Sequence, residues 1–427
     1  MNLSGLSFNA LPPIDLPFRF FLSAPVFMLA CAGLVFFAGE DLWFSRWHPY
    51  MLALTHGFTL GFLTMVMFGA LLQLLPVIAG IGIPQPRLFA SISHLFLTFG
   101  TVSIMLSFIY GKDWMLYSAI IFLGLGLGLY LLVLAWVLFK KLSQGDSITG
   151  FRLAIFALLA VLLLGLVLLA RNLGFDWAAT NWIATGKQVT NIHALWGLVG
   201  WAGILIIAVS FQVIPMFHVA PSFPKIITRY LAAGIFISLL VFTLYPAIAL
   251  PVLSLCHGVF AVTLLVVINK RKRKVPDTSI RYWQLAAMSL LLTSILYFIP
   301  NTLWDSYIAV DKGLLIGALF IYFYLLSVIQ GMLLKILPFL SYTHLQQRCL
   351  VDFSAMQFIP HMHEFLNKKH GQWLFRLHLL SGLCLVLVLL QPASYFVFAS
   401  AMMLEFCWLL FIMMKTMRLY SSIDKKI

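Results

Sequence analysis

Twelve long apolar stretches follow one another along this chain, separated by shorter polar segments. A membrane-spanning helix needs about 20 predominantly apolar residues, and every stretch is close to or above that length. The expected spans are 17–39, 50–79, 88–110, 114–139, 152–171, 190–217, 227–246, 249–269, 282–300, 312–338, 372–391 and 394–416. The pattern predicts an all-α polytopic membrane protein with about twelve transmembrane helices in a single domain, residues 1–427.

The composition excludes a water-soluble chain. Hydrophobic residues make up 62% of the sequence and charged residues 9%, whereas soluble domains carry about 25% charged residues. A soluble enzyme, a disordered protein and a coiled coil are therefore ruled out, and the lipid bilayer is the expected partner. The formal net charge of +14 does not indicate nucleic acid, because membrane proteins keep Lys and Arg in cytoplasmic loops.

The distribution of basic residues predicts the orientation. With a cytoplasmic N-terminus, five of the 27 Lys and Arg residues lie outside, and the others, including the run from Lys270 to Lys274, lie inside. The outside residues are Arg46, Lys112, Arg171, Lys187 and Lys312. This asymmetry predicts a multi-pass protein of the bacterial inner membrane with both termini in the cytoplasm. The basic run could also contact anionic lipid.

Several local features favour structural roles. Residues 1–17 lack a basic region and a small-residue cleavage site, so no cleaved signal peptide is expected. The five cysteines form no CxxC pair and are expected to be buried apolar side chains. His361 and His363 could hold a metal, although a solvated loop explains the pair equally well. Trp177 and Trp182 are expected at the level of the lipid headgroups.

Three expected spans end in a similar motif, which indicates an internal repeat. The motifs are Gln73-Leu74-Leu75-Pro76, Gln212-Val213-Ile214-Pro215 and Lys335-Ile336-Leu337-Pro338. They occur four spans apart, and each places a long polar side chain one turn before a proline that is expected to end the helix. The period predicts three quasi-equivalent four-helix units around a pseudo-threefold axis, and the alternative is a coincidence of common helix-end residues.

Four histidines lie within or beside the spans near the expected outer face. His56, His193 and His257 lie in the second, sixth and eighth spans, and His48 precedes the second span. An ionisable group inside a membrane is costly and indicates function, and neutral imidazole is a common ligand of haem iron and copper. The alternative for each is a hydrogen-bonded structural histidine.

Small residues accompany two of these histidines. Glycines follow His56 and His193 along their helices, where they could admit a macrocycle or allow close helix packing. They are Gly57, Gly61, Gly69, Gly197, Gly200 and Gly203.

Glu405 lies in the middle of the last expected span. A carboxyl group there must be neutral or bonded to a neighbour, so Glu405 either relays protons or is a hydrogen-bonded acid. His94 and His378, in the third and eleventh spans, are expected to be structural.

The pattern resembles the haem–copper oxidase subunit I superfamily, which includes the nitric oxide reductases. The stretch from Thr55-His56-Gly57 to Leu74-Leu75-Pro76 is similar to its helix 2, whose histidine ligates a haem, and His193 lies where that superfamily has a copper ligand. The segments Trp47-His48 and His193-Ala194-Leu195 resemble the NnrS family of haem- and copper-associated proteins linked to nitric oxide stress. The resemblance implies haem b and copper as cofactors. Together with the depth of the histidines in the spans, it makes His56, His193 and His257 the candidate cofactor-binding residues and His56, His193 and His48 the candidate metal ligands.

The chain also departs from that superfamily. Oxidases carry two histidines on helix 10, and residues 313–338 contain none. They also carry a His-His pair at helix 7, where this chain has His218 at the opposite end. A complete binuclear centre and dioxygen reduction are therefore not expected, although a degenerate haem–copper oxidoreductase remains open.

Three functions remain open. The first is a haem- or copper-binding protein that handles nitric oxide, electrons or metal, with a respiratory or electron-donor protein as partner. The second is a transporter or small-ligand carrier in which the histidines bind substrate and the prolines Pro76, Pro215 and Pro338 break gating helices. Against it, transporter repeats are usually twofold. The third is a structural or assembly subunit without a cofactor.

Overall fold

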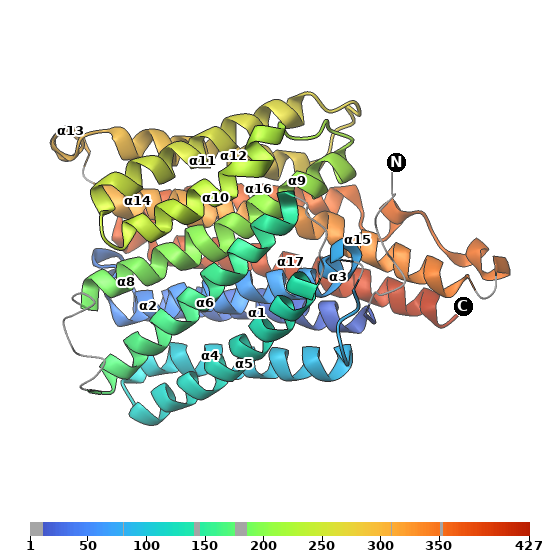
Figure 1. Cartoon of the computed structure of the whole chain (residues 1–427), viewed down its shortest axis with the longest axis horizontal. Coiled ribbons are helices and arrows are strands. Elements are labelled where there is room, and N and C mark those ends of the chain that lie inside the picture. Colours follow the sequence, from blue (N-terminus) through green and yellow to red (C-terminus); the bar gives the residue numbers. More distant parts are fainter. Residues whose placement is uncertain (1–11, 80, 141–145, 176–185, 309, 351–352) are drawn as a thin grey trace. The chain divides into compact units, whose positions relative to one another are not determined.

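The computed structural model describes residues 12–79, 81–140, 146–175, 186–308, 310–350 and 353–427. This part of the chain contains helices and no strand (Figure 1). Within these described ranges, eleven helices are long and apolar enough to cross a membrane, or twelve if a pair bent by 105° counts as one span. Each of the twelve expected spans coincides with one of them, so the all-α, multi-pass fold class is confirmed. Trp177, Trp182 and most of the N-terminal segment examined for a signal peptide lie outside the described residues.

The chain divides into two compact units. Unit 1 comprises residues 75–275 and 284–325, and unit 2 comprises residues 12–74, 276–283 and 326–427. The long helices of unit 1 are α4 (Pro86–Tyr110), α5 (Asp113–Lys140), α6 (Asp146–Asn172), α8 (Gly186–Leu195), α9 (Ile204–His218), α10 (Lys225–Phe242) and α11 (Pro246–Asn269), followed by α13 (Asn301–Tyr307) and α14 (Lys312–Ala318). Those of unit 2 are α1 (Asp15–Ala38), α2 (Pro49–His56), α3 (Met65–Ala79), which runs on into unit 1, α15 (Ser327–Arg348), α16 (Lys368–Leu390) and α17 (Tyr395–Asp424). The helix α12 (Thr278–Phe298) begins in unit 2 and continues in unit 1.

Local sequence signals set several helix ends. Pro49, Pro86 and Pro246 begin α2, α4 and α11 at the first turn, where a missing N–H costs nothing. Gly111 follows α4 with a φ of 61°, a left-handed conformation that glycine adopts without steric cost. Asp311 caps α14 by accepting a hydrogen bond from the Leu314 N–H. These signals place the turns between successive spans.

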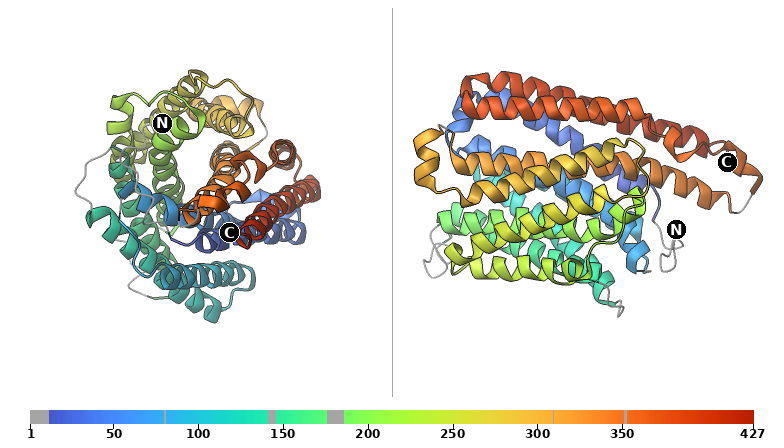
Figure 2. Two further views of the ribbon diagram at one scale, coloured as in Figure 1. Left: turned by 90° about the vertical axis from the view of Figure 1, so that its right-hand side faces the viewer. Right: turned by 90° about the horizontal axis from the view of Figure 1, so that it is seen from above.

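Glycines allow close packing within each unit. In unit 1, α4 and α5 run side by side (Figures 1 and 2), and a Cβ on Gly100 would lie 2.7 Å from the Leu123 side chain. In unit 2, α17 packs against both α1 and α16. Phe406 of α17 meets Phe62 edge-to-face with ring centroids 5.5 Å apart. Close contact of this kind replaces the hydrophobic effect as the force between helices in lipid.

The three repeat helices each contain a π-helical segment of eight residues. The segments are η2 (Gly57–Thr64), η3 (Trp196–Gly203) and η4 (Leu319–Leu326). Each begins at the same spacing from its proline: Gly57 from Pro76, Trp196 from Pro215, and Leu319 from Pro338. No other π-helical segment occurs in the described part of the chain. Because π-segments are rare, their shared register supports the internal repeat independently of the motif.

The same register fixes how each repeat helix packs. Seven residues before the prolines stand Gly69, Ala208 and Gly331, all small. A Cβ on Gly69 would lie 2.8 Å from Phe21 of α1, and one on Gly331 would lie 2.6 Å from Tyr282 of α12. The Ala208 Cβ lies 2.6 Å from the position of a Cβ on Gly150 of α6. Each repeat helix therefore packs closely against the span that precedes it.

The polar residue of the motif also has an equivalent role in two copies. Gln73 donates a hydrogen bond of 3.1 Å to the carbonyl of Pro12, just before α1. Lys335 pairs with Asp277 at 2.5 Å, just before α12. For Gln212, the stretch before α6 lies outside the described residues. The pseudo-threefold axis and the single domain stay predictions, whereas the three repeat helices are equivalent in backbone and in packing neighbour.

The expectation that the three prolines end their helices is wrong. The helices continue past Pro76 to Ala79, past Pro215 to His218 and past Pro338 to Arg348. A proline removes one backbone hydrogen bond, and a helix in a membrane protein tolerates this loss where neighbouring helices pack around it. The extension of α15 also makes the start of the connection between the expected spans 312–338 and 372–391 helical.

Candidate functional site

His257 is a buried histidine of α11 in unit 1, with 5% of its surface exposed. Its Nδ1 lies 2.7 Å from the Leu253 carbonyl oxygen, which can only accept, so Nδ1 carries the proton. In the neutral ring, Nε2 then has a lone pair. No hydrogen-bond partner for Nε2 occurs in the described part of the structure. His257 therefore presents an unsatisfied buried acceptor, which is rare in a folded protein.

Two of the π-segments contribute the surroundings of this ring. A Cβ on Gly203, the last residue of η3, would lie 3.8 Å from His257 Nε2. Phe320 of η4 meets the His257 ring at a centroid distance of 5.6 Å and an interplanar angle of 76°. The imidazole of His257 therefore lies between Gly203 of η3 and the Phe320 ring of η4, within unit 1.

His193 occupies a different environment of unit 1. Its Nδ1 lies 3.1 Å from the Val161 carbonyl of α6, and its Cε1 lies 3.1 Å from the position of a Cβ on Gly165. The half-buried ring therefore fills a notch that Gly165 leaves in α6. The neighbours of His193 are on α6, whereas those of His257 are on η3 and η4.

His56 and His48 belong to unit 2. His56 ends α2, is half-buried, and has Nδ1 2.8 Å from the Leu52 carbonyl oxygen. His48 stands at the N-cap position of α2 and stacks on Tyr50 with ring centroids 5.4 Å apart. A pocket shared by His56 with His193 or His257 stays a prediction.

The three histidines of the spans share one hydrogen-bonding pattern. In each of His56, His193 and His257, Nδ1 faces a backbone carbonyl. This arrangement selects the tautomer in which Nε2 is the acceptor, as in histidines that ligate metals. Among the described residues, no group of three or more His, Cys, Asp or Glu side chains could hold a metal ion. A haem needs only one or two imidazoles.

The glycines around the histidines serve mainly for helix packing. A Cβ on Gly61 would lie 2.4 Å from Phe27 of α1, and one on Gly200 would lie 2.9 Å from Ala157 of α6. Gly203 differs because its missing side chain faces His257 and the Leu198 carbonyl. Of the glycines that sequence analysis singled out, Gly203 is thus the one placed beside a candidate ligand.

Glu405 takes part in a second buried site, which lies in unit 2 and joins four helices. Its Oε1 accepts a hydrogen bond of 2.6 Å from Gln330 Nε2 and one of 2.8 Å from His378 Nδ1. Tyr282 donates to Gln330 Oε1 at 2.9 Å, and Ser327 Oγ lies 2.8 Å from His378 Nε2. All five residues are buried; Glu405 and His378 are both 0% exposed. We call these residues the Glu405 network.

His378 is the member of the network that sequence analysis assigned only a structural role. A signal was present, because His378 and Glu405 lie on consecutive spans at similar distances from the connection at Pro392. Two antiparallel helices joined by a short turn bring such residues to one depth. Gln330 and Ser327, by contrast, have no sequence signal that distinguishes them from other polar residues of the spans.

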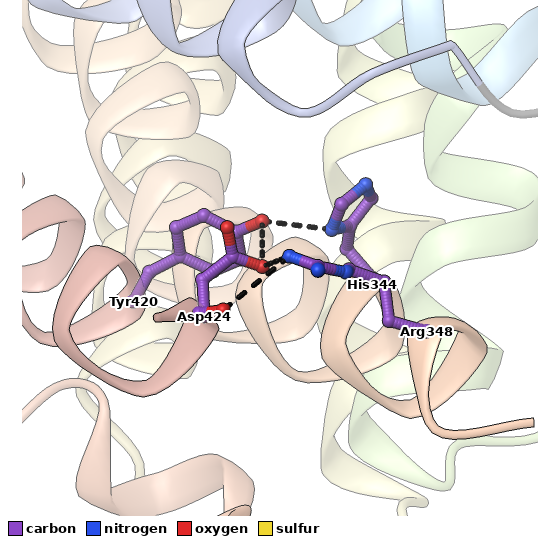
Figure 3. A network of polar contacts seen from close by, with 4 residues as sticks. All are labelled: His344, Arg348, Tyr420 and Asp424. Atoms are coloured by element: carbon purple, nitrogen blue, oxygen red, sulfur yellow. Dashed lines mark hydrogen bonds and ion pairs between the residues drawn. The ribbon is translucent and has the colours of Figure 1, made fainter. Parts of the chain in front are cut away.

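A third polar cluster joins α15 and α17 near their C-terminal ends, also in unit 2 (Figure 3). The Tyr420 hydroxyl lies 2.9 Å from His344 Nδ1 and donates a hydrogen bond of 3.2 Å to Asp424 Oδ1, which also pairs with Arg348. The side chains of Arg348 and Asp424 are 44% and 29% exposed. Exposed ion pairs contribute little to stability. We therefore describe this cluster as a polar contact between the C-terminal ends of α15 and α17.

A scan against protein-family models found no match, and a search of the curated proteins found none either.

Proposed function

We propose that this multi-pass membrane protein binds haem through histidines of its spans, as a relative of haem–copper oxidase subunit I without a complete binuclear centre. Its role is to bind a diatomic gas such as nitric oxide or to pass electrons. The observation that carries the proposal is the His257 imidazole, whose Nδ1 is held by Leu253 and whose buried Nε2 has no partner among the described residues.

An unsatisfied buried acceptor costs about 1–3 kcal/mol, so its retention needs a reason. Ligation of haem iron by Nε2 would remove this cost, because the lone pair would be donated to the metal. The hydrogen bond from Nδ1 to the Leu253 carbonyl would orient the ring and increase the basicity of Nε2. Gly203, with no side chain, places no Cβ beside Nε2 on the side of η3.

A haem held there would supply redox chemistry or an iron position that binds a gas. His257 would hold the haem, and His56 and His193 would be the further candidates, since their Nδ1 atoms also face carbonyls. A haem held by one histidine would supply gas binding, and one held by two would supply electron transfer. Copper is the other metal that the resemblance implies, and the described residues contain no group of three His, Cys, Asp or Glu side chains that could hold it.

The proposal includes an orientation of the chain in the membrane. The asymmetry of Lys and Arg places both termini in the cytoplasm and the chain in the bacterial inner membrane. His48, His56, His193 and His257 then lie toward the outer face. An electron donor or a gas would reach the cofactor from that side.

The test is a reduced-minus-oxidised absorption spectrum of the purified protein in mild detergent, with analysis of iron and copper. The wild type is expected to show a Soret band and a sharp α-band. His257→Ala is expected to lose or shift both bands. His94→Ala, which removes a half-buried histidine of α4 elsewhere in unit 1, is the matched control and should keep them.

Three results would redirect the proposal. A wild-type protein without haem or copper would contradict it and favour a carrier of small ligands. Copper without haem would favour a role in metal handling. A haem spectrum unchanged in His257→Ala but lost in His56→Ala would reject His257 as the ligand.

A further inference from the structure

The Glu405 network has a feature that haem binding does not use. It places an acid and an imidazole, both fully buried, in direct contact. Burial of an unpaired charge in such a place would cost far more than the few kcal/mol by which proteins are stable, so the pair must be balanced by its neighbours. The neighbours show which protonation states can be balanced.

The Gln330 amide has a fixed direction. Its Oε1 accepts from the Tyr282 hydroxyl, and its Nε2 therefore donates to Glu405. His378 Nδ1 lies 2.8 Å from the same carboxyl oxygen and donates to it when Glu405 is a carboxylate. Glu405 Oε1 then receives two donors, which stabilise the carboxylate, and the bond from Gln330 is also compatible with a neutral acid.

The second ring nitrogen of His378, Nε2, can keep its hydrogen bond in either protonation state. Nε2 faces the Ser327 hydroxyl, which donates to a neutral imidazole or accepts from an imidazolium after rotation about one bond. Every hydrogen bond of the network can therefore be made both with and without a proton on Nε2. A purely structural network requires only one such state.

We infer that His378 and Glu405 form a proton-binding pair in unit 2, which takes up and releases one proton with Ser327, Gln330 and Tyr282 as its fixed partners. In the released state, a neutral His378 faces a Glu405 carboxylate, with one negative charge. A proton from hydronium, added to His378 Nε2 or to the carboxylate, gives a pair of net charge zero and leaves water. The inference does not depend on haem.

The half-buried ion pair between Lys335 and Asp277 joins the same two elements as the Tyr282–Gln330 hydrogen bond. Asp277 lies five residues before Tyr282, and Lys335 lies five residues after Gln330, a distance of about 7.5 Å along each helix. The side chains of Lys335 and Asp277 are 22% and 24% exposed. The ion pair is therefore a partly exposed polar group within about one and a half helical turns of the Glu405 network.

The elements that pack around the pair carry further ionisable groups. Tyr282 of α12 faces Gln330, and α15 contributes Lys335, which is paired with Asp277. On α1, which packs against α17, the Cys31 thiol donates to the Leu54 carbonyl. The remaining ionisable groups of the neighbouring helices in unit 2 are Asp15, Arg19, Tyr50, His56, Arg281, Tyr342, His344, Arg348, Lys368, Lys369, His370, Cys384, Tyr395, Cys407, Lys415, Arg418, Tyr420 and Asp424. The Arg376 side chain lies over the Trp373 ring.

The composition of the chain makes the test unusually direct. The sequence contains three glutamates: Glu40, Glu364 and Glu405. Glu40 and Glu364 are exposed, and Glu405 is buried. Infrared spectra of the full protein labelled with ¹³C at the glutamate side-chain carboxyl therefore report on one buried acid and two exposed ones.

The experiment follows the labelled C=O stretch of the protonated acid from about pH 5 to about pH 9, the range in which histidine-coupled groups titrate. We expect a band that exchanges slowly in D₂O and changes with pH. It should disappear in Glu405→Gln and persist in Glu40→Gln. In His378→Asn its midpoint should move by about one pH unit or more.

Two results would overturn the inference. If neither the protonated C=O band nor the carboxylate bands of labelled Glu405 change over the whole range, the pair does not exchange a proton. If the midpoint is the same in His378→Asn, the two residues do not act as a pair. The two measurements need only the wild-type protein and His378→Asn. If His378→Asn does not fold, the wild-type titration still decides whether the pair exchanges a proton. A Ser327→Ala protein, which keeps both ionisable groups, decides whether the hydroxyl is needed.

Discussion

His257 in unit 1 and His378 in unit 2 are both buried histidines of apolar helices, yet they differ in how their second nitrogen is satisfied. His257 bonds one carbonyl and leaves Nε2 without a partner among the described residues. His378 bonds Glu405 through Nδ1 and Ser327 through Nε2. Burial alone therefore does not identify a ligand histidine. The unsatisfied lone pair favours metal binding, and the completed set of partners favours proton binding.

The largest expected effect comes from making His378 resemble His257. Glu405→Leu removes the carboxyl that His378 and Gln330 face and leaves two buried donors without an acceptor. We expect a loss of about 3–5 kcal/mol in stability, seen as a large fall in the thermal unfolding temperature in detergent. Glu405→Gln, which keeps an acceptor oxygen for His378, should lose much less. Equal losses in the two variants would mean that the size of the side chain matters and its oxygen does not.

A change at Gly203 tests whether the space beside His257 is used. In Gly203→Val the new side chain would meet the Leu198 carbonyl and approach His257 Nε2, since even a Cβ would lie 3.2 Å from the first and 3.8 Å from the second. We expect haem affinity to fall by roughly tenfold to a hundredfold, measured by haem titration of the apoprotein. If the Gly203→Val protein binds haem as tightly as the wild type, nothing binds on that side of the His257 ring.

A smaller effect is expected from overpacking where Gly331 contacts Tyr282, a member of the Glu405 network. In Gly331→Ala the added methyl would lie 2.6 Å from the Tyr282 Cβ, so α12 or α15 must shift. Overpacking of this kind costs about 1–3 kcal/mol. Gly317→Ala is the matched control in α14, because a Cβ there meets nothing within 4 Å. Unfolding temperatures that agree between the two variants would contradict the close contact.

The smallest expected effect is that of Tyr282→Phe. This variant removes the hydroxyl that fixes the Gln330 amide, at a cost of about 1 kcal/mol for one hydrogen bond. The amide is then free to reverse, so the infrared midpoint of Glu405 should move although both ionisable residues remain. A midpoint that stays at the wild-type value would show that Tyr282 does not orient the network.

The spans could be predicted from the sequence because length and hydropathy are local properties of the chain. The internal repeat could also be predicted, since its motif recurs with a fixed period at Pro76, Pro215 and Pro338. The continuation of the helices past these prolines could not, because it depends on how neighbouring helices replace the lost hydrogen bond. Nothing in the residue types of η2, η3 and η4 signalled π-helical backbone.

The two candidate sites were predicted to different degrees. His257 and Glu405 were recognised because ionisable residues are costly in apolar spans. The unsatisfied Nε2 of His257 could not be foreseen, because it depends on the tertiary position of η3 and η4. The pairing of His378 with Glu405 was within reach of the sequence, whereas the contribution of Gln330 and Ser327 required side-chain positions from a third helix.

The three π-segments have a consequence for the history of the chain. A π-turn holds one residue more than regular helix needs, and each residue advances a helix by about 100°. Deleting one residue from such a segment would rotate the part of the helix beyond it about the helix axis. His56 or His193 would then face a new neighbour. The extra residue occurs at the same register in all three repeat helices. The simplest explanation is that an ancestral helix acquired this residue before the helix was duplicated.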